Sequence, residues 1–345
     1  MRHHMLEAIR LAAAEHPHPN PRVGAIVLDP GGSVVGRGAH VAAGAEHAES
    51  IALAEAGERA RDGTMVVTLE PCSHLGRTPP CTEAILRAGI SRVIVGVGDP
   101  DERVSGSGIA RLREAGVEVV TDVAPAEVHR LDPGYFHHRR TGRPLVTLKM
   151  AATLDGQSAA ADGSSRWITG PEAREDAHRL RAASDAVMVG AGTVRDDDPR
   201  LTVRLDGYGG HQPRPVIVAG RGPLPRSAAI FSREPLVYSP HPVDTRGEVV
   251  VMPSGDVVDL VEMIADLGKR DIVDLLCEGG PHLATGLLQE GLVDRLVLYL
   301  GGSLAMGTGR PVLGGVFASV DQARRVDITR ITRFGPDLRV DAEVA

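Results

Sequence analysis

At 345 residues the chain exceeds a typical single domain, so two domains are expected, and an apolar content of 42% allows each to build a core. The net charge of −7 gives no general attraction to nucleic-acid phosphates, and 3% aromatic residues argue against a platform for stacked bases. Without a leader or an apolar run of about twenty residues, the chain is expected to be cytoplasmic, free of the membrane, and active on a small molecule.

The first half of the chain alternates between strand-like and helical segments. Strands are predicted at 23–28, 34–36, 65–69, 93–97 and 117–120, and helices at 47–61, 81–88 and 106–115. This alternation predicts an α/β sheet domain. The stretch 137–144 is polar and is interrupted by glycine and proline, so we expect a solvated linker there. The predicted domains are therefore 1–144 and 145–345.

The most informative pattern in this half is His47-Ala48-Glu49, followed by Cys72 and Cys81. One nitrogen and two sulfur donors suit zinc, and three protein ligands instead of four leave a position for a water that the metal acidifies. Residues two apart point about 200° from one another on a helix, so His47 and Glu49 can share a site only near a helix's first turn. Zinc-dependent nucleobase deaminases use such an unligated glutamate as general acid and base. The pattern therefore predicts a hydrolytic zinc site.

Other interpretations of the same residues remain open. A single His-x-Glu is common on helix surfaces, and two cysteines nine positions apart are often ordinary buried residues. A zinc-stabilised binding protein would need a fourth protein ligand, for which His74 is the nearest candidate. A deaminase of tRNA or free cytidine would share the pattern, but it has no need of a second half. The remaining cysteine, Cys277, ends an apolar run, so no disulfide framework is expected.

A second sheet is expected after residue 144. Strand-like runs occur at 145–149, 186–189, 215–219, 248–252, 271–276 and 295–299, which makes this half α/β as well. No Gly-x-Gly-x-x-Gly follows the first of these strands, so a Rossmann fold is not supported. The segment 278–286 follows an apolar strand and precedes a helix, an arrangement that can hold a phosphate, although a glycine pair there can equally be a plain turn.

Several longer runs carry a family resemblance. The eleven residues from Pro71 to Cys81 far exceed the general deaminase pattern, and they are accompanied in order by Pro19 to Gly24, Lys149 to Gly156 and Val194 to Arg204. Over nearly its whole length the chain resembles the bifunctional deaminase-reductases of riboflavin biosynthesis. The resemblance implies a cytidine-deaminase-like three-layer α/β/α domain followed by a dihydrofolate-reductase-like α/β domain. It also implies Zn²⁺ and NADPH as cofactors.

The resemblance implies two reactions on small-molecule substrates. The first is zinc-hydroxide deamination of 2,5-diamino-6-(5-phosphoribosylamino)pyrimidin-4-one. In the second, NADPH reduces the ribosyl group of 5-amino-6-(5-phosphoribosylamino)uracil to the ribityl product. The alternative is a chain active only as a deaminase, with a degenerate reductase domain. A homo-oligomeric assembly is compatible with the sequence.

The resemblance also assigns site residues. In the first domain, Glu49 is catalytic, the metal ligands are His47, Cys72 and Cys81, and the substrate contacts are Asn20, His40, His74 and Arg77. In the second domain, the substrate contacts are Ser165, Arg181, Leu201, Arg204 and Glu278. The cofactor contacts are Ala151, Trp167, Thr193, Asp197, Gly220, Gly280, Pro281, His282, Leu283, Ala284, Thr285 and Gly286. Asn20 between two prolines could instead shape a turn, and Trp167 could instead be a core anchor.

Four departures from the family pattern bear on these assignments. The segment before His18 is short, and Asp101 replaces the usual asparagine, which adds an anion near the substrate's ribose-phosphate end. Ala219-Gly220 replaces Asp-Ser or Asp-Thr, which removes a hydroxyl near the cofactor, and Arg221 is a candidate substitute at the 2′-phosphate. The segment 300–303 stands where a Pro-Lys pair is common. The last two departures both fall in the reductase half.

Overall fold

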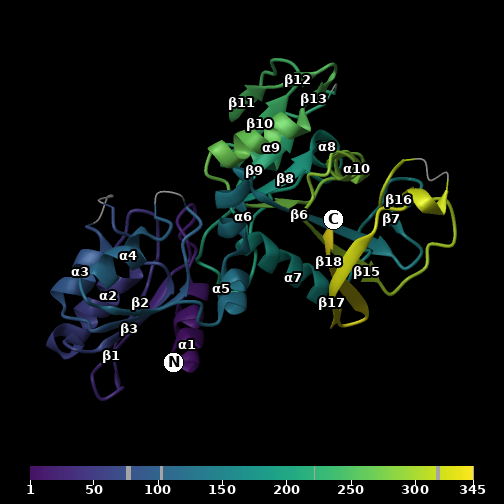
Figure 1. The fold of residues 1–345 in the computed structure, drawn as a ribbon. Helices are drawn as coiled ribbons and strands as arrows, with labels where there is room; N and C mark the ends of the chain where they lie inside the picture. The colour runs from purple at the N-terminus through teal and green to yellow at the C-terminus, as the bar shows by residue number, and fades with distance from the viewer. Residues whose placement is uncertain (75–78, 102–103, 221, 316–318, 345) are drawn as a thin grey trace. The chain divides into compact units, whose positions relative to one another are not determined.

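The computed structural model describes residues 1–74, 79–101, 104–220, 222–315 and 319–344. The chain divides into two units, an N-terminal unit of Met1–Gly142 and a C-terminal unit of Arg143–Ala345 (Figure 1). Among the described residues, no helix is both long and apolar enough to span a membrane.

A five-stranded sheet forms the centre of the N-terminal unit, in the order β2-β1-β3-β4-β5. The strand β1 runs antiparallel to β2 and β3, whereas β3, β4 and β5 are parallel to one another. The bounds are β1 (Gly24–Leu28), β2 (Val34–Ala39), β3 (Thr64–Leu69), β4 (Arg92–Val97) and β5 (Glu118–Val120). The five strands predicted for this half are therefore confirmed. Every residue of β1 is buried, as expected of a strand covered on both faces.

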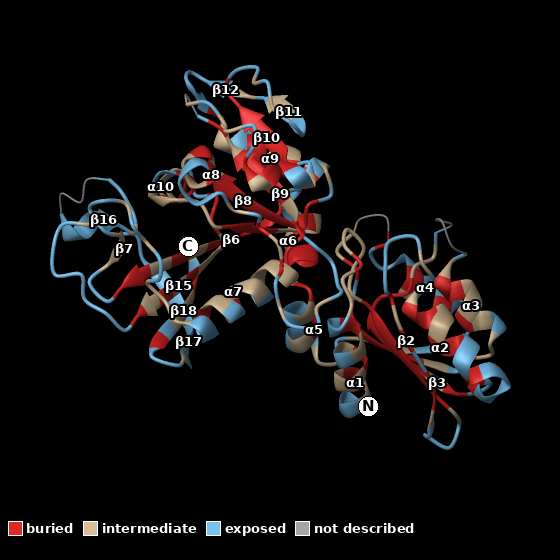
Figure 2. Cartoon of the chain, turned by 180° about the vertical axis from the view of Figure 1, so that it is seen from behind, coloured by how far each residue is buried: buried red, intermediate tan, exposed pale blue. Residues whose placement is uncertain are grey.

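Helices cover this sheet. The neighbouring helices α2 (Ala48–Ala56), α3 (Cys81–Arg87) and α4 (Ser107–Glu114) form one group (Figure 2). A second group contains α1 (Arg2–Ala13), α5 (Pro125–Leu131) and α6 (Pro133–Thr141). A short 3₁₀ turn, η1 (Gly57–Ala60), continues α2. The helices predicted at 47–61, 81–88 and 106–115 are present, and α1 and α5 are additional to the prediction.

The segment predicted to be a solvated linker is mostly helical, so that prediction is wrong. The side chain of Asp132 accepts a hydrogen bond from the backbone N–H of Tyr135, which caps the start of α6. Tyr135 and Phe136 are buried, and the helix ends at Gly142, which takes a left-handed φ of 73°. The polar run at 137–140 is thus the later part of a helix whose buried anchors precede it in the chain.

A nine-stranded sheet forms the C-terminal unit, in the order β11-β10-β9-β8-β14-β6-β15-β18-β17. Neighbouring strands are parallel from β11 to β15, and β18 and β17 extend the sheet in the antiparallel sense. The bounds are β6 (Leu145–Thr153), β8 (Ala186–Gly190), β9 (Arg214–Val218), β10 (Leu236–Ser239), β11 (Glu248–Val251), β14 (Asp274–Cys277), β15 (Arg295–Gly301), β17 (Val326–Phe334) and β18 (Asp337–Val344). Two small ribbons pair β7 (Gln157–Ala159) with β16 (Arg310–Pro311), and β12 (Pro253–Ser254) with β13 (Val257–Val258).

Both faces of the central part of this large sheet are buried, as the alternation along β8 shows. Ala186 and Met188 belong to an apolar cluster that includes residues of α9 (Leu260–Lys269) and α10 (Pro281–Gln289). Val187 and Val189 belong to a separate cluster that draws on α7 (Pro171–Ala182), α8 (Ala191–Asp197) and the 3₁₀ turn η2 (Ala229–Arg233). Another 3₁₀ turn, η3, spans Val320–Gln322. A parallel sheet with two covered faces is the α/β arrangement predicted for this half.

Candidate active sites

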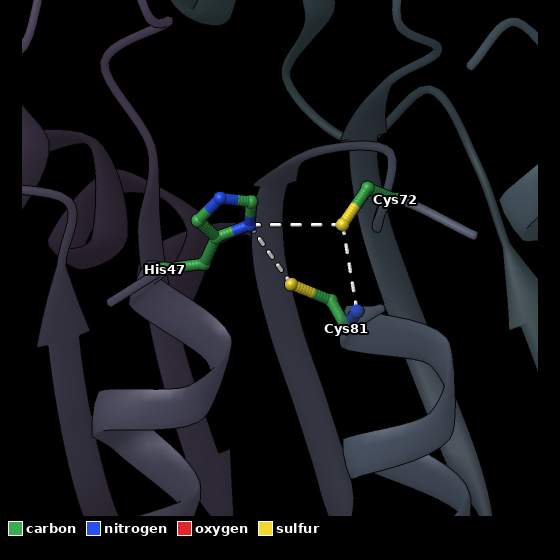
Figure 3. Close-up of side chains that lie close together, drawn as sticks. All are labelled: His47, Cys72 and Cys81. Atoms are coloured by element: carbon green, nitrogen blue, oxygen red, sulfur yellow. Dashed lines mark hydrogen bonds between the residues drawn. The ribbon is translucent and has the colours of Figure 1, made fainter. Parts of the chain in front are cut away.

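Three side chains from two helix starts and one strand end meet in the N-terminal unit. His47 is the N-cap of α2, Cys81 is the first residue of α3, and Cys72 follows β3. The Nδ1 atom of His47 lies 3.1 Å from the sulfur of Cys81 and 3.6 Å from the sulfur of Cys72 (Figure 3). The backbone N–H of Cys81 donates to the Cys72 sulfur at 3.4 Å. The structure therefore brings the predicted ligand triad together, with donor atoms within 4.8 Å of one another.

The donor chemistry of this triad fits zinc. Hydrogen bonds from the Cys81 thiol and from His47 lower the pKa of Cys72 to about 4, although burial opposes this, so its sulfur is a thiolate at neutral pH. The hydrogen bond with Cys72 and burial hold the pKa of Cys81 above its usual range. A divalent cation among the three donors would remove the repulsion between two thiolates and let both sulfurs bind. One nitrogen and two sulfurs are a known donor set for zinc.

Glu49 lies beside the triad but is not one of its ligand candidates. It is the second residue of α2, which confirms the expected position in the helix's first turn. Only 3% of Glu49 is exposed, and this burial raises the pKa of its carboxyl, although the charge of His47 opposes the shift. A carboxyl whose pKa is raised in this way is suited to take up and release a proton next to the metal position.

Asn20 and His40 are joined to each other. Nδ1 of His40 donates to the carbonyl of Glu46 at 3.0 Å, and Nε2 of His40 accepts the side-chain amide of Asn20 at 2.9 Å. Burial lowers the pKa of His40, which keeps the ring neutral. Both ring nitrogens thus form hydrogen bonds within the chain. In this structure His40 therefore orients Asn20. His74 is exposed, and Arg77 lies outside the described residues.

Glu70 is a functional candidate that the sequence reasoning missed. This buried carboxylate accepts backbone N–H groups from Gly106 and Gly108 at 2.9 Å each, from Ile109 at 3.1 Å and from Asp99 at 3.3 Å. It thereby ties the strand end that carries Cys72 to the first turn of α4. A glutamate directly after a buried strand, two residues before a ligand, is the signal that could have identified it.

The anion expected from Asp101 is offset in the structure. A side-chain oxygen of Asp101 lies 3.6 Å from Nε of Arg139, and its backbone N–H donates to Asp99 at 2.9 Å. The Arg139 guanidinium also lies 5.0 Å from the ring centre of Tyr135 and donates to the carbonyl of Pro19 at 3.0 Å. The extra charge therefore has a cation beside it, held by α6.

An ion-pair cluster marks the second candidate site, in the C-terminal unit. Arg181 of α7 binds the carboxylate of Glu278 through two nitrogens, at 2.6 and 3.0 Å, directly after β14. Lys149 of β6 lies 3.9 Å from the same carboxylate. Although burial raises it, the pKa of Glu278 is lowered to about 2 by the charges of Arg181 and Lys149. Lys149 was not predicted as a site residue, since a lysine within a strand carries no local signature.

Thr202 connects the two predicted substrate arginines. Its carbonyl accepts from Arg181 at 3.0 Å, and its hydroxyl accepts from Arg204 at 3.2 Å. The backbone N–H of Arg204 donates to His178 at 3.3 Å. Burial, together with both arginines, lowers the pKa of His178 to about 4, so the ring is neutral between two cations. The predicted Leu201 is only 2% exposed and has a φ of 52°, so little of this residue is open to a ligand in this structure.

A cavity of about 820 Å³ lies in the C-terminal unit, where β8, β9 and β14 end. It is lined by the predicted residues Thr193, Gly220, Gly280, His282, Leu283 and Gly286. Residues that were not predicted also line it, among them Arg195, Ser254, Val257, Asp259 and Val261. Gly280 is the N-cap of α10, so backbone N–H groups of that helix are available to a phosphate. The size and this helix start fit a dinucleotide such as NADPH.

Other predicted cofactor residues are not among those that line this cavity. Ala151, Trp167, Asp197, Pro281, Ala284 and Thr285 belong to this group. Trp167 is 69% exposed, with the Arg174 guanidinium 4.3 Å from its ring centre, so the alternative of a core anchor is wrong. Asp197 lies 3.8 Å from Arg166, and the Thr285 hydroxyl accepts the backbone N–H of Gly314. The half-buried Ser165 lies near Trp167 in the chain.

Comparisons with known proteins agree with this geometry in both halves. The cytidine and deoxycytidylate deaminase zinc-binding region matches residues 1–97, and the RibD C-terminal domain matches residues 144–340. The riboflavin biosynthesis protein RibD of Aquifex aeolicus is 40% identical, over 94% of this chain and 92% of its own length. The Escherichia coli protein of the same name is 37% identical over 97% of each chain.

Solved structures extend the likeness to the fold. Acinetobacter baumannii RibD has a TM-score of 0.92 and 34% identity, covering 100% of this chain and 98% of its own. A Thermotoga maritima protein described as a diaminohydroxyphosphoribosylaminopyrimidine deaminase and 5-amino-6-(5-phosphoribosylamino)uracil reductase has a TM-score of 0.91 and 31% identity, covering 100% of both chains. The predicted fold class, a cytidine-deaminase-like domain followed by a dihydrofolate-reductase-like domain, is confirmed. With both halves matched in order, the chain belongs to the RibD family of riboflavin biosynthesis proteins.

Proposed function

We propose that this chain is a bifunctional enzyme that catalyses two steps of riboflavin biosynthesis. It deaminates 2,5-diamino-6-(5-phosphoribosylamino)pyrimidin-4-one and then reduces the ribosyl group of 5-amino-6-(5-phosphoribosylamino)uracil. The observation that carries the proposal is the buried Glu49 beside the triad of His47, Cys72 and Cys81. Residues 1–144 form the zinc-dependent deaminase domain, and residues 145–345 form the NADPH-dependent reductase domain.

In the deaminase domain, the side chains of this chain position the substrate and move protons. When bound, zinc acidifies a water and so supplies the hydroxide that replaces the amine. Glu49 takes up the proton of that water and delivers protons to the ring nitrogen and to the departing ammonia. Asn20 gives its amide to His40, so its carbonyl oxygen is available to an N–H on the pyrimidine edge. His74 and Arg77 are proposed to bind the ribose and phosphate.

In the reductase domain, NADPH supplies the hydride when it is bound in the cavity at the ends of β8, β9 and β14. Arg181 and Arg204, connected through Thr202, form a cradle for the substrate phosphate, which guanidinium groups bind well. The sugar ring opens before reduction. Lys149 is placed to donate a proton in this step, and the neighbouring carboxylate of Glu278 is placed to accept one. Ser165 and Leu201 complete the proposed substrate contacts.

Product analysis by mass, with and without NADPH, tests this function. Purified protein with the diaminopyrimidinone substrate alone should give a product in which water has replaced ammonia. Added NADPH should give a further gain of two hydrogens, together with oxidation of the cofactor. Absence of the deaminated product would refute the proposal. Deamination without any reduction would instead favour the alternative of a degenerate reductase domain.

A further inference from the structure

Arg195 lines the cofactor cavity, but none of the roles assigned above involves it. It lies in α8 and is the only lysine or arginine among the described residues that line the cavity. Arg221, the candidate suggested by the sequence, lies outside the described residues. Its Nη1 donates to the carbonyl of Pro223 at 3.4 Å, and no carboxylate of the described residues lies within ion-pair distance of it. A cation that faces a cavity without a carboxylate partner is suited to an anionic ligand.

The order of the strands tells which part of a dinucleotide reaches Arg195. The cavity lies at the ends of β14, β8 and β9, which are adjacent strands about 5 Å apart. On the far side of β14 is β6, which carries Lys149 beside Glu278, so the reacting nicotinamide half must lie toward β6. The pyrophosphate fits the start of α10, directly after β14. The adenosine half therefore extends toward β9.

Arg195 lies on that side. A Cβ placed at Gly222, in the loop after β9, would be 3.1 Å from Nη1 of Arg195. Among the described residues beyond its chain neighbours, a Cβ at Gly220 would meet no atom within 4 Å, which leaves room on this side of Gly220. Ala219 and Gly220 also offer no carboxylate that would bind the free 2′-hydroxyl of an NADH ribose.

The charges around the cavity favour a phosphate at this point. NADPH differs from NADH only in the phosphate on the adenosine 2′-oxygen, and a phosphate monoester carries about −1.5 to −2 charge at pH 7. The described acidic lining residues are Asp259 and Glu290. Asp259 caps α9 through the backbone N–H of Glu262 at 2.9 Å, and Glu290 is the C-cap of α10, at the opposite end of that helix from Gly280. We propose that Arg195 binds the 2′-phosphate and makes this reductase prefer NADPH over NADH. This inference rests on the proposed reductase function.

Direct binding to the full-length protein tests the inference without turnover. Calorimetric titrations with NADPH, NADH, 2′,5′-ADP and 5′-ADP are compared for wild type, Arg195→Ala and Arg195→Lys. In the alanine variant the Kd for NADPH and 2′,5′-ADP should rise roughly ten- to hundredfold, the range expected for one charge-assisted contact. The Kd for NADH and 5′-ADP should stay within about twofold, and lysine should restore part of the difference.

Arg333→Ala is the matched control. Arg333 lies in β17 of the same unit, is exposed, and likewise donates to a backbone carbonyl, that of Gly335 at 2.9 Å, but it does not line the cavity. This variant should leave all four affinities unchanged. An equal loss of NADPH and NADH binding in Arg195→Ala would refute the inference, and so would no loss of either. A wild-type protein that binds neither dinucleotide would refute the reductase function itself.

Discussion

Glu49 allows proton transfer to be separated from metal binding, since it is not among the residues placed to ligate. Glu49→Gln should retain zinc and lose deamination almost completely, because the amide keeps the shape of the side chain but cannot shuttle a proton. Metal analysis and ammonia release measure the two properties on the same preparation. Substantial residual turnover in a zinc-loaded variant would contradict the assignment.

Cys72→Ser tests metal binding itself, whereas Glu49→Gln tests proton transfer with the metal retained. Loss of one thiolate should reduce bound zinc to well below one per chain and lower the melting temperature of the N-terminal unit, because metal binding contributes to folding. The buried Cys277, which lies in β14 of the other unit, offers a control as Cys277→Ser. That control should keep its zinc. Full zinc occupancy in Cys72→Ser would show that this sulfur is not a ligand.

Arg204 is predicted to act on the reductase reaction alone. Arg204→Ala should lower kcat/KM for the phosphorylated uracil substrate roughly ten- to hundredfold, since one charge-assisted contact is lost, and Arg204→Lys should recover part of this. Deamination should stay at the wild-type rate. Steady-state kinetics of both reactions measure the effect. Unchanged reductase constants in the alanine variant would show that Arg204 is an ordinary surface residue.

Because the pKa of Glu278 is lowered, we expect the C-terminal unit to lose stability in acid. Its pKa in the folded protein is about 2, below the ordinary 4.5, so its contribution is present above pH 4.5 and is lost as the pH falls toward 2. Glu278→Gln should destabilise the unit at pH 6 by about 3 kcal/mol or more, because it leaves Arg181 without its carboxylate. The difference from wild type should shrink below pH 4.5. Calorimetric unfolding across this range measures it, with the exposed Glu262→Gln as control, and a pH-independent difference would contradict it.

Local motifs explain which site residues could be predicted from the sequence. His47, Cys72 and Cys81 lie at the ends of regular elements with diagnostic spacing, so they were recognisable without a structure. Lys149 and Arg195 have no such spacing. Each becomes a candidate only when strands far apart in the chain become neighbours, as β6 and β14 do.

At the scale of elements, α4 and the strand end after β3 fit together through a glycine. A Cβ at Gly108 would lie 1.8 Å from the carbonyl oxygen of Pro71, which directly precedes Cys72. Gly108→Ala should therefore push α4 away from the Cys72 segment, destabilise the unit by about 1 to 3 kcal/mol and weaken zinc retention. Thermal unfolding and metal analysis measure both effects. Gly209→Ala, where the added Cβ would meet nothing within 4 Å, should change neither.

Element boundaries were predicted best where a buried strand has a continuous apolar run. The segments β1, β3 and β4 are of this kind, and each was predicted to within about a residue. Residues 137–140 are helical and not a linker because the buried Tyr135 and Phe136 before them anchor α6. Which side of a short helix is buried depends on the residues that pack against it. Those residues lie elsewhere in the chain, so the local sequence does not show them.

At the scale of the whole molecule, the C-terminal unit should work alone. It begins at Arg143, whose guanidinium binds the carboxylate of Asp294 at 2.6 and 2.8 Å, so a fragment of 143–345 keeps this pair. The fragment should fold, reduce the ribosylamino-uracil with NADPH and show no deamination. Circular dichroism and NADPH oxidation measure this. A folded fragment without reductase activity would indicate that the departures at Ala219-Gly220 and 300–303 have removed it.

The strand order of the two sheets also bears on how the chain acquires its shape during synthesis. All strands of the first sheet lie between Gly24 and Val120, so every partner has left the ribosome soon after the last of them is made. By contrast, β6 is the first strand of the second sheet, yet both of its neighbours, β14 and β15, come more than a hundred residues later. The N-terminal unit can therefore fold and bind its metal during synthesis. The apolar strand β6, by contrast, stays unpaired until β14 and β15 have been translated.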